Sequence, residues 1–191
     1  MYAEQGGDAH LVLAGPNVHA VADDPEGAEV FNEVLTAYRA LRHEIRSRVE
    51  LANLPMADVE ENAAIVNALQ RHATVIVQKS IQEGFGLTVT EAMWKGKPVI
   101  GSRVGGIPDQ IEHGVSGLLL DDPLDYRQFS ELVGLVTSHP ELAERLGVNA
   151  KERVKECFLS LRSLYFYGDL ISHLLEAGGA HDGIRAEVQV V

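Results

Sequence analysis

The stretch EGFGLTVTEAMWKGKPVIGSRVGG, residues 83–106, holds a glycine-containing loop, a helix-like segment and a strand-like segment in immediate succession. Glycine adopts backbone conformations that other residues avoid, so a tight loop is expected at residues 83–86. The segment from Leu87 to Trp94 or Lys95 predicts a helix that Gly96 ends at its C′ position, and residues 97–102 predict a strand. This order predicts one repeating unit of an α/β fold.

The same alternation continues on both sides of this stretch. Continuous apolar strands alternating with helices predict a Rossmann-like, doubly wound parallel sheet, and the run HLVLAG at 10–15 is typical of a strand buried on both faces. Ligands of such sheets bind beyond the carboxyl ends of the strands. Strands are expected at 10–15, 49–55, 74–80, 97–102 and 114–122, and helices at about 24–48, 58–72, 87–95, 108–112, 123–138, 140–155 and 158–178.

Composition and charge exclude several classes of protein. A chain of 191 residues can form one large domain, and its 16 basic and 28 acidic residues give a net charge of −12 that disfavours nucleic acid and anionic membrane surfaces as partners. No run approaches the roughly 18 apolar residues of a membrane-spanning helix. The single cysteine, Cys157, allows no internal disulfide, and the eight histidines lack metal-binding spacing, so no metal is expected and a cytoplasmic location fits best.

The glycine loop and the following helix start could bind phosphate. Backbone N–H groups at a helix N-terminus attract anions, and carboxylates at Glu83 and Glu91 could accept hydrogen bonds from sugar hydroxyls on either side of a diphosphate. The dinucleotide fingerprint G-x-G-x-x-G is absent, however, because Val89 stands at the position of the third glycine. A simple loop with a solvated helix start therefore remains an alternative.

The two glutamates and the sequence that follows them closely resemble the E-x7-E signature of retaining glycosyltransferases with the GT-B fold. The resemblance extends over roughly residues 10–155 and implies the C-terminal, nucleotide-sugar-binding domain of that fold. VIVQKSIQEGFGLTVTEAMWKGKPVIG, residues 75–101, looks most like trehalose synthases, which join a nucleotide-activated glucose to glucose. Trehalose phosphorylases are similar too, but the intact Gly86-Leu87-Thr88 is closer to the synthases.

This resemblance assigns roles to individual residues. It implies a UDP- or ADP-glucose donor, an acceptor sugar, which is glucose in the synthases, no cofactor and no metal. It also implies that the departing diphosphate deprotonates the acceptor, so that Glu83 binds the sugar and is no nucleophile. The implied ligand contacts are Glu83, Gly84, Phe85 and Gly86 for the donor sugar, Gly86, Leu87 and Thr88 for the diphosphate, Glu91 for the ribose, and Asn53 and Leu54 for the nucleobase.

The resemblance also implies that parts of the enzyme lie outside this chain. The first strand and helix of the domain, with the Arg and Lys that clamp the diphosphate, and the N-terminal acceptor domain are expected to be missing, so the chain alone is expected to be inactive. Lys79, Lys95 and Arg103 do not stand at the clamp positions and are expected to be solvated. The expected divisions are a domain at 1–157, a helix at 158–176 and a flexible tail at 177–191.

The helix at 158–176 has more apolar surface than packing on one sheet requires. In the family such a helix crosses to the N-terminal domain, which predicts an unpartnered face and self-association through 158–175. The apolar residues are Leu161, Leu164, Tyr165, Leu170, Ile171, Leu174 and Leu175.

Three other functions remain open. The chain could be a non-catalytic nucleotide-sugar-binding or assembly module, a domain of a nucleotide-sugar epimerase, or a domain of a trehalose phosphorylase. The intact E-x7-E signature with its flanking sequence disfavours the epimerase.

Overall fold

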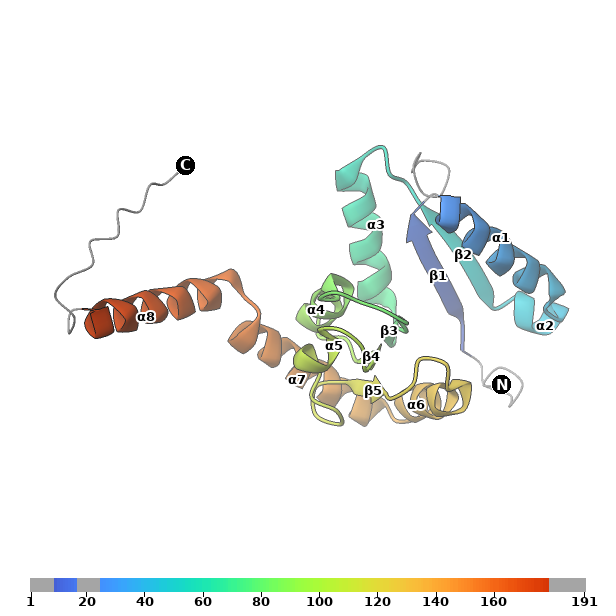
Figure 1. Cartoon of the computed structure of the whole chain (residues 1–191). Helices are drawn as coiled ribbons and strands as arrows, with labels where there is room; N and C mark the ends of the chain where they lie inside the picture. The colour runs from blue at the N-terminus through green and yellow to red at the C-terminus, as the bar shows by residue number, and fades with distance from the viewer. Residues whose placement is uncertain (1–8, 17–24, 179–191) are drawn as a thin grey trace.

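The structure is a computed structural model that describes residues 9–16 and 25–178. Within these residues strands and helices alternate, as the sequence predicts (Figure 1). The strands are β1 (Leu11–Pro16), β2 (Val49–Leu54), β3 (Ile76–Gln78), β4 (Val99–Ser102) and β5 (Leu118–Leu120). The helices are α1 (Pro25–Ala40), α2 (His43–Arg46), α3 (Val59–His72), α4 (Leu87–Trp94), α5 (Ile107–Gln110), α6 (Tyr126–Ser138), α7 (Pro140–Cys157) and α8 (Ser160–Gly178).

All strand pairs in the described residues are parallel, which confirms the predicted α/β class. The strands hydrogen-bond in two groups. β1 pairs with β2 from Leu11 opposite Val49 onward, while β4 lies between β3 and β5. The carboxyl ends of β3, β4 and β5 therefore meet at one edge, where the segments that precede α4, α5 and α6 begin.

Helices cover both faces of the β3–β4–β5 group, which makes it doubly wound. On one face Val99 and Leu119 pack with residues of three helices, namely Met93 of α4, Ile107 of α5 and Val154 of α7. On the other face Ile100 and Leu118 pack with α6 and α7. The strand alternation sends successive residues of β4 to opposite faces, and both faces are buried.

The expectation that the first strand is fully buried is wrong in this structure. Leu11, Val12 and Leu13 of β1 are 47%, 46% and 45% exposed. β1 pairs only with β2 among the described strands, and neither of the two buried clusters includes a β1 residue. An apolar strand without a second neighbour or a covering layer stays open to solvent.

The helix expected from about residue 24 to residue 48 is divided. α1 ends at Ala40, Arg42 takes an extended conformation with φ −57° and ψ 147°, and a short α2 follows. A short turn connects α2 to β2. Arg48 O in this turn accepts a hydrogen bond from Leu11 N–H at the start of the β1–β2 pair. The predicted cap at Asp23 or Asp24 lies outside the described residues.

Several local signals agree with the structure. The Asp58 side chain caps α3 by accepting hydrogen bonds from the N–H groups of Glu60 and Glu61 at 2.9 and 3.1 Å. Gly96 follows the last turn of α4 with φ +70°, as a C′ glycine does. A methyl group at Gly147 of α7 would lie 2.1 Å from Gly96 O, so this glycine lets the end of α4 and the middle of α7 pack closely.

The last helix leaves its apolar residues exposed. α8 extends away from the rest of the described chain, on the side opposite α1 and α2 (Figure 1). The seven apolar residues predicted to form its surplus face are between 43% and 72% exposed. Phe166 and Tyr167 are also exposed and make an edge-to-face ring contact with each other.

Candidate functional site

The glycine loop follows β3 and leads into α4 at the carboxyl edge of the β3–β4–β5 group. Gly86 is the N-cap of α4 and has φ +86°, a left-handed conformation that strongly favours glycine. It offers no side chain to cap the helix, and the first turn of α4 contains no acidic residue. Leu87 and Thr88 are exposed residues, and their N–H groups have no side-chain cap, an arrangement that favours anion binding at the helix start.

The Gly-Gly pair before α5 supports this loop from behind. Gly106 N–H donates a 2.7 Å hydrogen bond to Gly84 O. Gly105 has φ +53°, and a methyl group there would lie 1.8 Å from Glu83 O. Only glycine allows this close approach, so the segment after β4 fixes the backbone of the loop after β3.

Gln110 supports the loop from α5, and the sequence analysis did not identify it. Its side chain is fully buried, accepts a 2.5 Å hydrogen bond from Thr90 Oγ1 of α4, and donates from Nε2 to Phe85 O. Arg153 of α7 donates to Gln110 O at 2.6 Å. The only sequence signal was a polar residue next to the apolar Ile111 in a short helix, which does not distinguish a buried amide from a solvated one.

The two signature glutamates differ in their surroundings. Glu83 is half-buried, and its carboxylate accepts hydrogen bonds from Gly84 N–H at 3.0 Å and Ser80 Oγ at 3.3 Å. Glu91 is exposed on the second turn of α4, and its carboxylate has no hydrogen bond or ion pair with the part of the chain that the structure describes. The two acids thus stand at the loop and on the helix that flank the α4 N-terminus.

The residues expected to contact the nucleobase belong to the other strand group. Asn53 and Leu54 lie at the carboxyl end of β2, and Asn53 pairs with Gly15 of β1. Asn53 is exposed and Leu54 is half-buried. They and the glycine loop belong to separate strand groups, which the strand pairing alone does not place at one site. Their assignment to the nucleobase stays a prediction.

Lys79, Lys95 and Arg103 each have an intramolecular partner, so they are not simply solvated as expected. The Lys79 ammonium lies 4.5 Å from the centre of the Tyr126 ring, and Lys95 Nζ donates to Gln70 Oε1 at 2.6 Å. Arg103 Nε pairs with Asp121 Oδ1 at 2.9 Å. Lys95 is the C-cap of α4, at the far end of the helix, so a diphosphate at the α4 start would compete only for Lys79 or Arg103 or be held by backbone N–H groups.

Asp121 follows β5 at the same edge and is held from two sides. Gln128 donates to Oδ2 at 2.8 Å and Arg103 donates to Oδ1 at 2.9 Å. The hydrogen bond from Gln128 is the largest cause, ahead of Arg103, that lowers the pKa of the Asp121 carboxyl. Asp121 is therefore an ionised anchor between α6 and the segment after β4.

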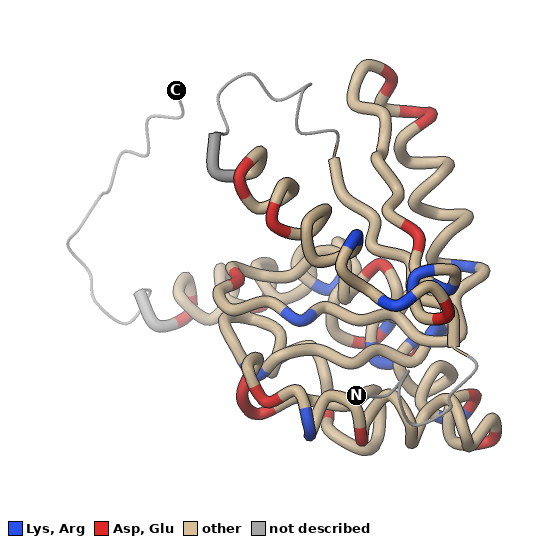
Figure 2. Tube along the Cα trace, turned by 90° about the vertical axis from the view of Figure 1, so that its right-hand side faces the viewer, with Lys and Arg blue, Asp and Glu red and all other residues tan. Residues whose placement is uncertain are grey.

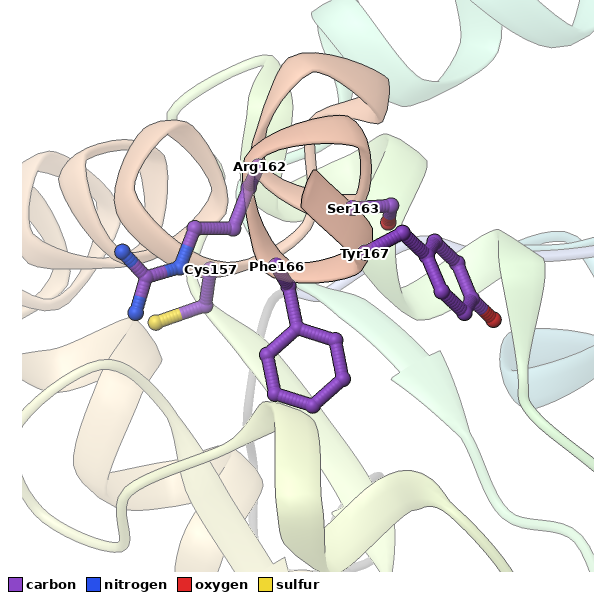
Figure 3. Close-up of a pocket in the computed structure, with 5 residues that line it drawn as sticks. All are labelled: Cys157, Arg162, Ser163, Phe166 and Tyr167. Carbon is purple, nitrogen blue, oxygen red and sulfur yellow. The ribbon is translucent and has the colours of Figure 1, made fainter. Parts of the chain in front are cut away.

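A pocket of about 260 Å³ lies at the junction of α7 and α8. Cys157, Arg162, Ser163, Phe166 and Tyr167 line it, and no residue of the glycine loop does (Figure 3). Phe85 of the loop packs against Phe158 beside this junction, with ring centres 6.0 Å apart. The pocket is therefore distinct from the candidate site, although one aromatic contact connects the two regions.

The described residues hold neither a metal-binding cluster nor a membrane-spanning helix. They contain no group of three or more His, Cys, Asp or Glu residues arranged to hold a metal ion. No helix among them combines the length and apolar character needed to cross a membrane. Acidic residues are spread over several segments of the described trace rather than gathered in one (Figure 2).

Comparison with known proteins identifies the family. The family model described as "Glycosyl transferases group 1" matches residues 3–153. A trehalose synthase of Pyrococcus horikoshii is 43% identical over 164 residues, which is 86% of this chain and 36% of that protein. A trehalose phosphorylase of Grifola frondosa is 38% identical over 111 residues, which is 58% of this chain and 14% of that protein.

A solved structure agrees with these sequence matches. Sucrose-phosphate synthase from Thermosynechococcus elongatus aligns with a TM-score of 0.68 and 27% identity over 92% of this chain and 41% of that chain. The chain thus spans little more than a third of the trehalose synthase and two fifths of this structural relative. The matched domain, the parallel α/β architecture and the GT-B structural relatives together show that the chain belongs to the group 1 glycosyl transferases with the GT-B fold.

Proposed function

We propose that this chain is the donor-binding domain of a retaining glucosyltransferase that transfers glucose from UDP- or ADP-glucose to an acceptor sugar. The acceptor proposed is glucose, which gives trehalose. The observation that carries this proposal is the glycine loop, supported from behind by Gly105 and Gly106, which leads into an uncapped helix start between Glu83 and Glu91. The 43% identity to a trehalose synthase supports the choice of product.

Each part of the donor has a proposed position. The diphosphate binds the N–H groups of Gly86, Leu87 and Thr88, where the helix dipole favours negative charge. The ribose hydroxyls donate to the Glu91 carboxylate, which has no partner in the described part of the chain. The transferred glucose lies against the loop and donates hydroxyl protons to Glu83.

The proposed chemistry depends on positioning and on stabilisation of the leaving group. The bond from the glucose C1 to the diphosphate oxygen breaks, a bond from C1 to the acceptor oxygen forms on the same face, and the acceptor proton passes to the departing diphosphate. Backbone N–H groups at the start of α4 stabilise the negative charge that develops on that diphosphate. Glu83 accepts hydrogen bonds in this scheme and forms no bond to C1.

A calorimetric titration tests the binding site. The chain is titrated with UDP, ADP and their glucose esters, beside Glu91→Ala and the control Glu152→Ala on the exposed side of α7. We expect binding by the parent and the control and a loss of about tenfold or more in Glu91→Ala, because a charged hydrogen-bond acceptor is removed. No binding by the parent at millimolar ligand, or equal binding by Glu91→Ala, would refute the site.

A second proposal concerns the rest of the enzyme. We propose that the acceptor domain of the complete enzyme packs on the apolar residues of α8 and that a further parallel strand pairs with the open edge of β1. The support is the exposure of both surfaces and the 36% share of the trehalose synthase that this chain spans. Transfer of glucose to glucose by this chain alone would contradict the need for a separate acceptor domain.

Trehalose phosphorylase activity is the other candidate. The 38% identity to the phosphorylase of Grifola frondosa supports it. A reaction of the complete enzyme with trehalose and inorganic phosphate, compared with trehalose and UDP or ADP, separates the two functions. Glucose release with phosphate alone would favour the phosphorylase, and release that requires a nucleoside diphosphate would favour the synthase.

A further inference from the structure

Two polar residues just before the signature hold the carboxylate of Glu83. Gln78 is the last residue of β3, and Ser80 lies two residues further on. Gln78 Nε2 donates to Ser80 Oγ at 2.9 Å, and Ser80 Oγ donates to Glu83 Oε2 at 3.3 Å. Gln78 Nε2 also lies 3.5 Å from Glu83 Oε2. The three side chains form one short hydrogen-bonded chain that starts on the strand and ends at the candidate sugar-binding acid.

The donor and acceptor roles in this series of hydrogen bonds follow from the chemical groups of Gln78, Ser80 and Glu83. An amide nitrogen only donates, so the Ser80 oxygen that faces Gln78 is an acceptor and the single hydroxyl proton is left for Glu83. Rotating the amide of Gln78 would place its carbonyl oxygen against the Glu83 carboxylate, and two acceptors repel. Gln78 therefore makes Ser80 a donor, and each hydrogen bond polarises the next.

Both oxygens of the Glu83 carboxylate accept hydrogen bonds within the protein, and the carboxylate still has free acceptor positions. Gly84 N–H occupies one position on Oε1, while Ser80 and Gln78 lie at Oε2. A carboxylate offers about four acceptor positions, so positions remain for ligand hydroxyls. Glu83 is half-buried, so part of its side chain stays open to a ligand.

The backbone beneath Glu83 is fixed independently. Gly106 N–H holds Gly84 O, and Gly105 lies against Glu83 O. The segment after β4 thus fixes the main chain of the loop, whereas Gln78 and Ser80 fix the side chain. Loss of the hydrogen bonds from Gln78 and Ser80 should therefore leave the diphosphate part of the site in place.

We propose that Gln78 and Ser80 are positioning residues that orient the Glu83 carboxylate toward the hydroxyls of the transferred sugar and so determine how much the sugar adds to donor affinity. The proposal rests on the proposed function of the same site. An acceptor held in its bound orientation costs less ordering free energy when the sugar binds. Neither residue needs to touch the donor for this effect.

The experiment uses a matched pair at Ser80. Ser80→Thr keeps the hydroxyl, and Ser80→Val has nearly the same shape as the threonine variant without it. Gln78→Met removes the amide donor at similar length. Each variant and the parent chain are titrated with UDP, UDP-glucose, ADP and ADP-glucose. For each nucleotide, the dissociation constant of the diphosphate divided by that of its glucose ester reports the contribution of the sugar. Thermal unfolding of each variant is measured in parallel.

The expected result is specific to the sugar. Ser80→Val should weaken binding of the nucleotide-glucose by about tenfold, since a hydrogen bond to a charged group is lost, and should change the diphosphate dissociation constant less than about twofold. Gln78→Met should give a smaller loss of the same kind, and Ser80→Thr should restore the parent ratio.

Other outcomes overturn the proposal in distinguishable ways. Ser80→Val could weaken binding of the diphosphate and of its glucose ester equally, or Ser80→Thr and Ser80→Val could give the same ratio of the two dissociation constants. Either result would show a general structural role. A ratio of the two dissociation constants in Ser80→Val equal to that of the parent would refute a sugar-dependent role while leaving the nucleotide site intact. A parent chain that binds neither ligand would refute the proposed function and this inference together.

Discussion

Thr90 of α4 donates a 2.5 Å hydrogen bond to the buried side chain of Gln110 in α5, and the same amide donates to Phe85 O in the glycine loop. One side chain thereby connects two helices and the loop that lies between β3 and α4. The amide is fully buried, so its hydrogen bonds are made within the protein. The geometry of the loop therefore depends on a residue that lies outside the signature.

Replacing Gln110 by leucine should destabilise the fold. Gln110→Leu removes the donor to Phe85 O and the acceptor of Thr90 Oγ1, and polar groups left without partners in a buried region cost about 1–3 kcal/mol. Urea unfolding at pH 7 measures the change. Gln82→Leu, at an exposed position of the loop, is the control and should change the free energy of unfolding by less than about 0.5 kcal/mol. Equal effects of the two substitutions would contradict the role of Gln110.

A methyl group at Gly105 should disrupt the candidate site. It would lie 1.8 Å from Glu83 O at a φ of +53°, so the loop must move. Gly105→Ala is expected to destabilise the chain by more than about 1–2 kcal/mol, the cost of a left-handed conformation alone, and to weaken nucleotide binding. Gly114→Ala is the matched control, because Gly114 has φ +79° with nothing within 4 Å of the added methyl group. Normal ligand binding by Gly105→Ala would show that the loop is not held from behind.

Two glycines in the last two helices should respond to alanine in opposite directions. Gly147→Ala places a methyl group 2.1 Å from Gly96 O and should separate α7 from α4, with a loss of about 1–3 kcal/mol from overpacking. Gly168→Ala in α8 meets nothing within 4 Å and should stabilise the helix by about 0.5–1 kcal/mol. Circular dichroism during thermal unfolding reports both. A destabilised Gly168→Ala would indicate that α8 packs more closely than it does in this structure.

Asp121 should make stability depend on pH. Because its folded-state pKa is lowered, mainly by Gln128 and then by Arg103, the unfolded chain takes up a proton first as the pH falls. The stabilisation is fully present above the unfolded-state pKa, which lies near the ordinary aspartate value of 3.8, and is lost as the pH falls through the lower folded-state pKa. Urea midpoints of the parent and Asp121→Asn should therefore differ at pH 7 and converge in stronger acid. A difference that persists in full below both pKa values would contradict this assignment.

The exposed face of α8 should make this chain self-associate. Leu164 and Ile171 lie seven residues apart on one stripe of the helix, and both are more than half exposed. The double substitution Leu164→Lys with Ile171→Lys should shift sedimentation velocity profiles toward monomer at a given concentration. His173→Lys, on the side of α8 that carries Arg162 and Asp169, should leave the profile unchanged. A parent chain that sediments as a monomer at all concentrations would contradict the prediction.

Local sequence signals predicted the elements around the site accurately. The bounds of α4, the C′ position of Gly96 and the cap at Asp58 depend on residues within one or two helical turns, so the sequence determines them directly. Gly105 and Gly106 stand at the end of the stretch 83–106, and their contact with Glu83 and Gly84 joins segments that follow different strands. Such contacts depend on strand order, which periodicity does not encode.

The remaining differences have the same origin. Gln110 bonds to Thr90 and Phe85, which lie 20 and 25 residues away, and no pattern near Gln110 indicates those partners. The apolar run of β1 predicted a buried strand, and this prediction is wrong because burial requires neighbours on both sides and β1 has only β2 among the described strands. The division of the helix before β2 depends on the extended conformation of Arg42, which no capping residue marks.

The open edge of β1 also bears on how this chain behaves in a cell or a test tube. Leu11, Val12 and Leu13 combine exposed apolar side chains with a row of backbone groups that β2 satisfies on one side only. Such an edge is a template for intermolecular β-pairing and aggregation. The glycine loop and α4, where we propose that the diphosphate binds, belong to the other strand group, whose central strand β4 is fully buried, so charged substitutions at the open edge of β1 would leave the diphosphate part of the proposed site untouched.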